Sequence, residues 1–309
     1  MKNKKNVVFI SIGVVVIAII LFLTINNHDG TPSSTTTSDA TVPTKTATTP
    51  PIVKSENAEA TDYTTLTLTT ADPVTEIAAI VGASNVPNIL RLNRINSTFL
   101  KAGSTVVIPK DPADFNSLSP FPTELPNATA IPKLMMVSQR VEAFGLYENG
   151  KLVRWGPVST GKQSTQTASK LYFTNWKGKE VHSSFSDEWV LKWNFNLDNA
   201  EGIGMHQYEM PGYPASHSCV RMFGTDAEWI YNWADQWIVS DDQQTVLAHG
   251  IPVLVFGTYA YGKTAPWKNL PKDAAATTLT ESELSKALAP ELSTIAQRQQ
   301  ERIDYLKNR

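Results

Sequence analysis

The sequence predicts a mainly β fold for the larger part of the chain, preceded by one small mixed domain. Runs of apolar and β-branched residues recur between residues 131 and 262, and turn residues separate them. The segment Glu148–Lys151 contains an Asn-Gly pair, which is typical of a tight hairpin. The net charge of −2 gives no reason to expect nucleic acid as a partner.

The N-terminal 26 residues are predicted to form a transmembrane anchor. Lys2, Lys4 and Lys5 precede an apolar run over 7–25, close to the length of about 20 residues that a membrane-spanning helix needs. The lysines place the amino end in the cytoplasm and the rest of the chain outside, so membrane lipid is an expected partner. A cleaved signal peptide is the alternative, although no Ala-x-Ala site follows the run. Residues 27–61, rich in Thr, Ser and Pro, are predicted to be a disordered linker.

Residues 62–110 are predicted to form a small βααβ domain. Strands are expected at 63–68 and 105–108, and helices at 74–81 and 87–93. The residues that carry a resemblance to a LysM domain are Asp72, Glu76-Ile77-Ala78, Leu92-Asn93, Ala102-Gly103 and Val106–Pro109. That family binds the N-acetylglucosamine-containing backbone of peptidoglycan or chitin, which implies sugar-binding loops at about 70–75 and 96–102. A plain spacer domain is the alternative.

A Pro-, Ser- and Asn-rich connector over 111–130 leads into the β domain at 131–262. Strands are expected at 133–138, 141–147, 151–159, 170–175, 188–194 and 251–258.

Two helices are expected in the C-terminal half. One follows Thr225, whose side chain would form a capping box with Glu228, and it carries tryptophans at positions 229, 233 and 237. This spacing favours core packing over stacking on a sugar. The tail, residues 263–309, is predicted to hold one long and largely solvated helix over 280–306, with a capping box of Thr280 and Glu283. Packing of this helix on the catalytic domain is left open.

Cys219 is the only cysteine, and His206, His217 and Arg221 lie near it in the sequence. A cysteine attacks as its thiolate, and an imidazole that takes the thiol proton stabilises that form. A buried apolar cysteine is the alternative, but the segment before it is polar and turn-rich. In an exported protein an unpaired cysteine also needs a function.

A zinc site is the other alternative, because His182, His206, His217 and Cys219 have ligand side chains. Their spacing matches no common zinc pattern. We therefore expect no metal and no cofactor.

His206 followed by Ser216-His217-Ser218-Cys219-Val220-Arg221 resembles the signature of the YkuD-type L,D-transpeptidases, over about residues 131–262. The resemblance implies a mixed β-sandwich fold and a place in the bacterial cell envelope, on the periplasmic side of the membrane. Two positions depart from the family pattern. Ser218 stands where most members have glycine, which is tolerated only if the backbone there does not need a positive φ. The segment 165–168 reads Thr-Gln-Thr-Ala where members have Thr-Pro-x-Gly.

The resemblance also implies roles for the site residues. Cys219 is the nucleophile and His206 the base, oriented by the backbone carbonyl of Gln207. Backbone N–H groups around Ser218 and Cys219, helped by His217, stabilise the oxyanion.

Three further residues are expected around the same site. Arg221 orients the cysteine loop or a substrate carboxylate. Tyr208 and Tyr213 are expected to line the pocket, or to be ordinary loop aromatics.

The function that this resemblance implies is acyl transfer from a peptidoglycan tetrapeptide stem through a thioester on Cys219, with release of D-alanine. A neighbouring stem amine would give a 3–3 cross-link, water would make the enzyme an L,D-carboxypeptidase, and a protein lysine would anchor a lipoprotein. The resemblance further implies acylation of Cys219 by carbapenems. The alternative from another class is a wall-binding protein whose catalytic domain has decayed. The oligomeric state stays open.

Overall fold

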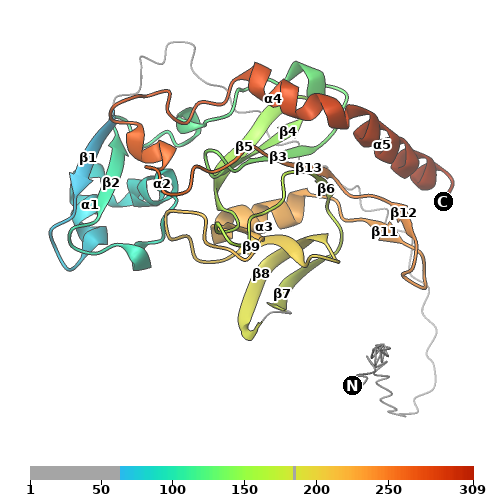
Figure 1. Ribbon diagram of the computed structural model, residues 1–309, viewed down its shortest axis with the longest axis horizontal. Coiled ribbons are helices and arrows are strands. Elements are labelled where there is room, and N and C mark those ends of the chain that lie inside the picture. Colours follow the sequence, from blue (N-terminus) through green and yellow to red (C-terminus); the bar gives the residue numbers. More distant parts are fainter. Residues whose placement is uncertain (1–62, 184–185) are drawn as a thin grey trace, which may run out of the picture. The chain divides into compact units, whose positions relative to one another are not determined.

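The computed structural model describes residues 63–183 and 186–309, and all of them belong to one compact unit (Figure 1). The predicted anchor at 1–26 and linker at 27–61 lie outside the described residues. Within the described part, no helix combines the length and the apolar character needed to span a bilayer.

The first domain has the predicted βααβ order. Strand β1 (Tyr63–Thr67) pairs antiparallel with β2 (Thr105–Pro109), and helices α1 (Pro73–Val81) and α2 (Val86–Leu92) lie between them in the chain. Helix α1 begins there because the Asp72 side chain accepts from the Thr75 N–H and a proline occupies the first turn. The domain has its own core, formed by Leu68, Ile77, Val86, Ile89, Leu100, Val106 and Ile108. We call residues 63–109 the small domain.

The second domain is built on a nine-stranded sheet in the order β6-β13-β3-β4-β5-β10-β9-β8-β7. Its strands are β3 (Leu134–Ser138), β4 (Ala143–Glu148), β5 (Lys151–Ser159), β6 (Leu171–Phe173), β7 (Lys177–Ser183), β8 (Ser186–Asp198), β9 (Ile203–Gln207), β10 (Val220–Met222) and β13 (Pro252–Phe256). Two short strands, β11 (Ile238–Val239) and β12 (Val246–Ala248), pair separately. The predicted Asn-Gly turn joins β4 to β5, and Asn149 and Gly150 both have positive φ.

The sheet buries both faces, because successive side chains of a strand point to opposite sides. In β3, Leu134 and Met136 belong to one apolar core, whereas Met135 and Val137 belong to the other. The second core also takes residues from β8, β9 and β10 and from helix α3 (Gly224–Trp233), so the two ends of the sheet curl around it. The mainly β prediction is confirmed. The predicted sandwich is, in the described residues, one continuous curled sheet.

The connector and the tail cover the other face. Leu118, Phe121 and Leu125 of the connector are buried in the first core, next to short 3₁₀ turns at Asn116–Leu118 and Pro126–Ala128. After a further turn at Pro266–Asn269, the tail adds helices α4 (Glu281–Leu288) and α5 (Leu292–Lys307).

The prediction of a single long tail helix was wrong, because the segment is divided into two helices. Pro290, which has no backbone N–H, lies in a 3₁₀ turn (Ala289–Glu291) that separates α4 from α5. Leu284, Leu288 and Ile295 are buried in the first core. The tail is therefore an integral layer of the fold.

Of the two predicted capping boxes, the structure shows the N-cap hydrogen bond of one and not that of the other. The Thr280 hydroxyl accepts from the Glu283 N–H at 3.1 Å, as predicted. Helix α3, by contrast, begins at Gly224 without a side-chain cap, so Thr225 lies inside its first turn.

The tryptophan stripe is shorter than predicted. Trp229 and Trp233 stack with ring centroids 5.5 Å apart and pack against the second core, in agreement with the core prediction. Trp237 lies beyond the end of α3.

Candidate active site

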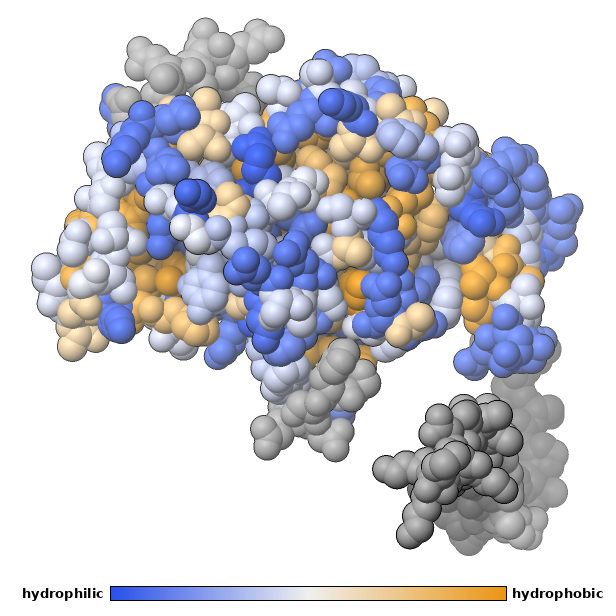
Figure 2. Space-filling view, viewed as in Figure 1, coloured by the Kyte–Doolittle hydropathy of each residue, from blue (hydrophilic) through white to orange (hydrophobic). Residues whose placement is uncertain are grey.

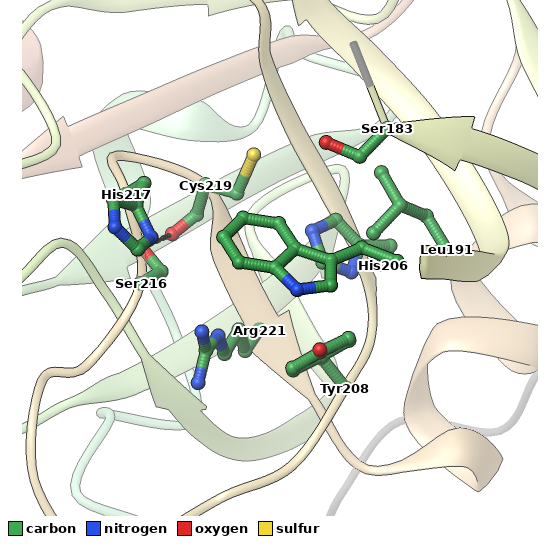
Figure 3. Close-up of a pocket in the computed structure, with 9 residues that line it drawn as sticks. Ser183, Leu191, His206, Tyr208, Ser216, His217, Cys219 and Arg221 are labelled. Carbon is green, nitrogen blue, oxygen red and sulfur yellow. Dashed lines mark hydrogen bonds between the residues drawn. The ribbon is translucent and has the colours of Figure 1, made fainter. Parts of the chain in front are cut away.

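Cys219 and His206 are brought together by two parallel neighbouring strands. Cys219 immediately precedes β10, His206 lies in β9, and the register places Arg221 beside His206. The loop over 208–218, which we call the active loop, joins the two strands. Figure 3 shows that the side chains of Cys219, His206, Arg221, Tyr208 and His217 surround one hollow.

Two hollows meet at the Cys219 thiol. The first is lined by Ser183, Trp189, Leu191, His206, Tyr208, Ser216, His217 and Arg221 as well as Cys219. The second, of about 210 Å³, shares Ser183, Leu191 and Cys219 with the first and has asparagines 194, 196 and 199 in its wall. The sulfur lies 3.6 Å from the Gly202 carbonyl oxygen, to which the thiol donates. Burial raises the pKa of the Cys219 thiol, and Arg221 partly opposes that shift.

His206 is buried and held in one tautomer. Its Nδ1 lies 3.0 Å from the Gln207 carbonyl oxygen, the contact expected from the resemblance. Because a carbonyl only accepts, Nδ1 carries the proton and Nε2 is left as an acceptor. Burial lowers the pKa of His206 to about 4, so the ring is neutral at neutral pH. A neutral imidazole and a protonated thiol are therefore the resting pair, rather than the thiolate that the sequence suggested.

His217 is held by Lys162, a residue that the sequence analysis did not single out. Lys162 Nζ lies 3.0 Å from His217 Nε2, and an ammonium only donates. His217 Nε2 is therefore the acceptor and Nδ1 carries the proton. That Nδ1 is buried without a hydrogen-bond partner. Partial burial, Lys162 and Arg221 lower the pKa of His217, so the ring is a neutral donor beside the first hollow.

Ser218 has a φ of 87°, a conformation that favours glycine. The condition given above for tolerating a serine here, a backbone without positive φ, is therefore not met. Thr167 Oγ1 donates to the Ser218 carbonyl at 2.8 Å, and Thr165 Oγ1 donates to the Ser216 carbonyl at 3.1 Å. The segment that departs from Thr-Pro-x-Gly thus binds the active loop directly, and it contributes more than the shape of a turn. Gln166 bonds only to the Gln163 carbonyl, outside the loop.

Arg221 lies over the Tyr208 ring at 4.6 Å and donates to the Glu209 carbonyl at 3.4 Å. It is half-buried at the edge of the first hollow, where a substrate carboxylate can pair with it. The Tyr208 ring stands edge-on to His206 at 6.0 Å. Tyr213 is 56 % exposed and lines a separate groove with Tyr259 and Tyr261, so of the two alternatives given above it is a loop aromatic outside the first hollow.

Sequence reasoning missed the wall formed by β7 and β8. Ser183, Trp189 and Leu191 line the first hollow, and the Trp189 ring lies 5.2 Å from that of His217. Trp189 and Leu191 alternate along a predicted strand, which placed them on one face but gave no sign that the face borders the cysteine. His182 lines only the second hollow. Over the described residues, no three His, Cys, Asp or Glu side chains are grouped to hold a metal.

Comparison with known proteins agrees with the resemblance. Residues 133–255 match the model of the YkuD family, the L,D-transpeptidase catalytic domain. None of the curated proteins matches the chain. Similar solved structures include an L,D-transpeptidase from Stackebrandtia nassauensis (22% identity, 42% of this chain and 57% of that one, TM-score 0.35). A second is an L,D-transpeptidase from Mycobacterium smegmatis (16% identity, 41% of this chain and 59% of that one, TM-score 0.33). A third is L,D-transpeptidase 3 from Mycobacterium tuberculosis with a faropenem-derived adduct (18% identity, 41% of this chain and 60% of that one, TM-score 0.33). The chain thus spans less than two thirds of each of these structures. The match to this family is confined to residues 133–255 of the 309 in the chain.

Proposed function

We propose that the protein is a peptidoglycan L,D-transpeptidase that works through a thioester on Cys219. One observation carries the proposal: the thiol lies where two hollows meet, and His206 lines one of them with Nδ1 tied to a carbonyl. A nucleophile that lines two hollows suits a reaction in which a donor peptide and an acceptor must both approach it.

The first half of the reaction forms the thioester. His206 Nε2 takes the Cys219 proton as Sγ attacks the carbonyl that precedes the terminal D-alanine of a tetrapeptide stem. Because the resting pair is neutral, this transfer accompanies substrate binding. Backbone N–H groups around Ser218 and Cys219, with the His217 Nδ1–H, stabilise the oxyanion. The C–N bond then breaks, and the proton on His206 goes to the leaving amine of D-alanine.

The second half releases the acyl group. An acceptor amine gives a proton to His206 and attacks the thioester, the C–S bond breaks, and the thiolate recovers its proton from His206. The product is a 3–3 cross-link. With water as acceptor the same steps give an L,D-carboxypeptidase, and with a protein lysine they anchor a lipoprotein.

We further propose that the small domain holds the glycan backbone, as a LysM domain does. The βααβ order supports this, and so do exposed apolar side chains in the two loops expected to bind sugar. Val74 lies in the first turn of α1, at the end of the segment 70–75, and Phe99 lies within the segment 96–102; each is 39 % exposed. Figure 2 shows apolar atoms at the surface of this end of the described part. With the predicted anchor at 1–26, the enzyme would work at the outer face of the bacterial cytoplasmic membrane, within reach of the wall.

A non-catalytic wall-binding protein is the second candidate, and the positive φ of Ser218 favours it, because a serine there strains the cysteine loop. A direct experiment separates the two functions. The full chain is incubated with a disaccharide tetrapeptide, and mass spectrometry measures adducts on the protein and free D-alanine. We expect an acyl adduct with loss of D-alanine on the wild type and none on Cys219→Ala, with equal binding of both to sacculi. An unmodified wild type that still binds sacculi would favour the second candidate.

A further inference from the structure

The small domain bonds directly to the active loop. The Asn96 N–H donates to the Met210 carbonyl at 2.7 Å, and the Met210 N–H donates to Asn96 Oδ1 at 2.6 Å. One asparagine thus satisfies both backbone groups of Met210. An isolated β-bridge between Ile95 and Pro211 continues the contact by one residue.

Two arginines beside this contact join the small domain to the second domain. Arg94 is 2 % exposed, donates to the Val141 carbonyl at 3.1 Å and lies over the Trp267 ring at 4.5 Å. Arg91 pairs at 3.0 Å with the buried Asp226 of α3. These contacts join the end of α2 to the second domain, so the residues that follow α2 start from a fixed point.

On that side the active loop has another backbone hydrogen bond, from the Tyr208 N–H to the Met222 carbonyl at 3.3 Å. Met210 follows His206 and Gln207 closely in the chain, and the neighbouring Glu209 carbonyl accepts from Arg221. At its far end the loop is held differently: the Ala215 N–H donates to Ser159 Oγ, and the Ser216 N–H donates to the Thr160 carbonyl. The contact at Met210 therefore adds a fixed point directly after Glu209, whose carbonyl accepts from Arg221, and ties this part of the loop to the small domain.

We propose that the small domain is a working part of the active site and that Asn96 is a positioning residue for the acyl transfer proposed above, on which this inference rests. Asn96 fixes Met210, and through it the path of the chain between His206 and Cys219. The predicted second sugar loop (96–102) begins at this same residue, so the small domain connects its own surface to the catalytic loop.

The test compares Asn96→Ala with Asn85→Ala in the full chain. Asn85 is a matched control, since its side chain donates to the Val81 carbonyl inside the small domain and touches neither the active loop nor the sheet. We expect Asn96→Ala to lower kcat for acylation by the disaccharide tetrapeptide about tenfold to a hundredfold, the range that a small misplacement of reacting groups produces. KM and sacculus binding should stay near those of Asn85→Ala. Asn96→Asp keeps the acceptor for the Met210 N–H and should restore most of kcat.

A second measurement does not depend on the proposed substrate. Cys219 is the only cysteine, so the rate of its alkylation by iodoacetamide, followed by intact mass against pH, reports its surroundings alone. The profile of Asn96→Ala should differ from those of the wild type, Asn96→Asp and Asn85→Ala. If the profiles differ but no variant is acylated, the proposed function fails and the positioning role stands. If Asn96→Ala and Asn85→Ala match in both kcat and alkylation profile, the positioning role is wrong. If Asn96→Ala does not fold, the Asn96→Asp variant still tests the proposal. A kcat and an alkylation profile like those of the wild type support the positioning role, whereas a lower kcat together with a changed alkylation profile overturns it.

Discussion

Replacing Ser218 by glycine tests whether the active loop stores strain. At a φ of 87° the Cβ of a non-glycine residue costs roughly 1–2 kcal/mol, whereas glycine adds about 0.5–1 kcal/mol of chain entropy to the unfolded state. The difference predicts that Ser218→Gly raises the free energy of unfolding by about 0.5–1 kcal/mol. For a domain of this size that is a rise in Tm of about 1–4 °C. Thermal unfolding followed by circular dichroism measures it.

Ser218→Ala is the matched control. It removes the hydroxyl, which donates to the neighbouring His217 carbonyl, but it keeps the Cβ. We expect Ser218→Ala to gain no stability, because the strain comes from the Cβ. If both variants gain equally, or if glycine lowers Tm, the strain argument is wrong.

Two further predictions concern titratable groups. Lys162→Met removes the positive charge and the hydrogen-bond donor at His217 Nε2, so the pKa of His217 should rise. The low-pH limb of the acylation rate against pH should then move to higher pH. Lys151→Met, at an exposed site, is the control, and a limb that is the same in both variants would contradict the Lys162–His217 contact. Burial raises the pKa of Glu142 from 4.5 to about 8, against bonds from the Thr160 N–H and hydroxyl. The folded state therefore holds this proton where the unfolded state has lost it, and stability should fall as the pH rises from about 4.5 to about 8. Urea unfolding at pH 5 and pH 8 should show a smaller fall for Glu142→Gln, and an equal fall in both proteins would place the effect elsewhere.

The sequence predicted the elements that local patterns define. Strand β5 was predicted to the residue, and α1 and α2 to within one residue, because hairpin turns, caps and apolar periodicity act over short distances. Strand β9, which carries the candidate base His206, was not predicted, and neither was β10, which begins directly after Cys219. They have few apolar residues in a row, and their pairing is parallel and set by the sheet.

The candidate site shows the same division. The residues Cys219, His206 and Arg221 came from a motif, and the structure places them around one hollow. The sequence did not point to Lys162, Trp189 or Asn96, because each comes from a segment distant in the chain and no local pattern shows that it lies near the site. The long tail helix was mispredicted because the composition of 280–306 favours helix throughout, whereas Pro290, which has no backbone N–H, divides the segment into two helices.

The burial of the tail has a consequence for shortened forms of the protein. The family match ends at residue 255, yet Trp267, Leu284, Leu288 and Ile295 fill the same core as β3, β4 and β5. Each such side chain contributes about 1.5–3 kcal/mol on burial, so losing all four removes about as much as the 5–15 kcal/mol that keeps a typical domain folded. A premature stop codon or a proteolytic cut after the last sheet strand would therefore leave a complete catalytic motif in a polypeptide that does not fold.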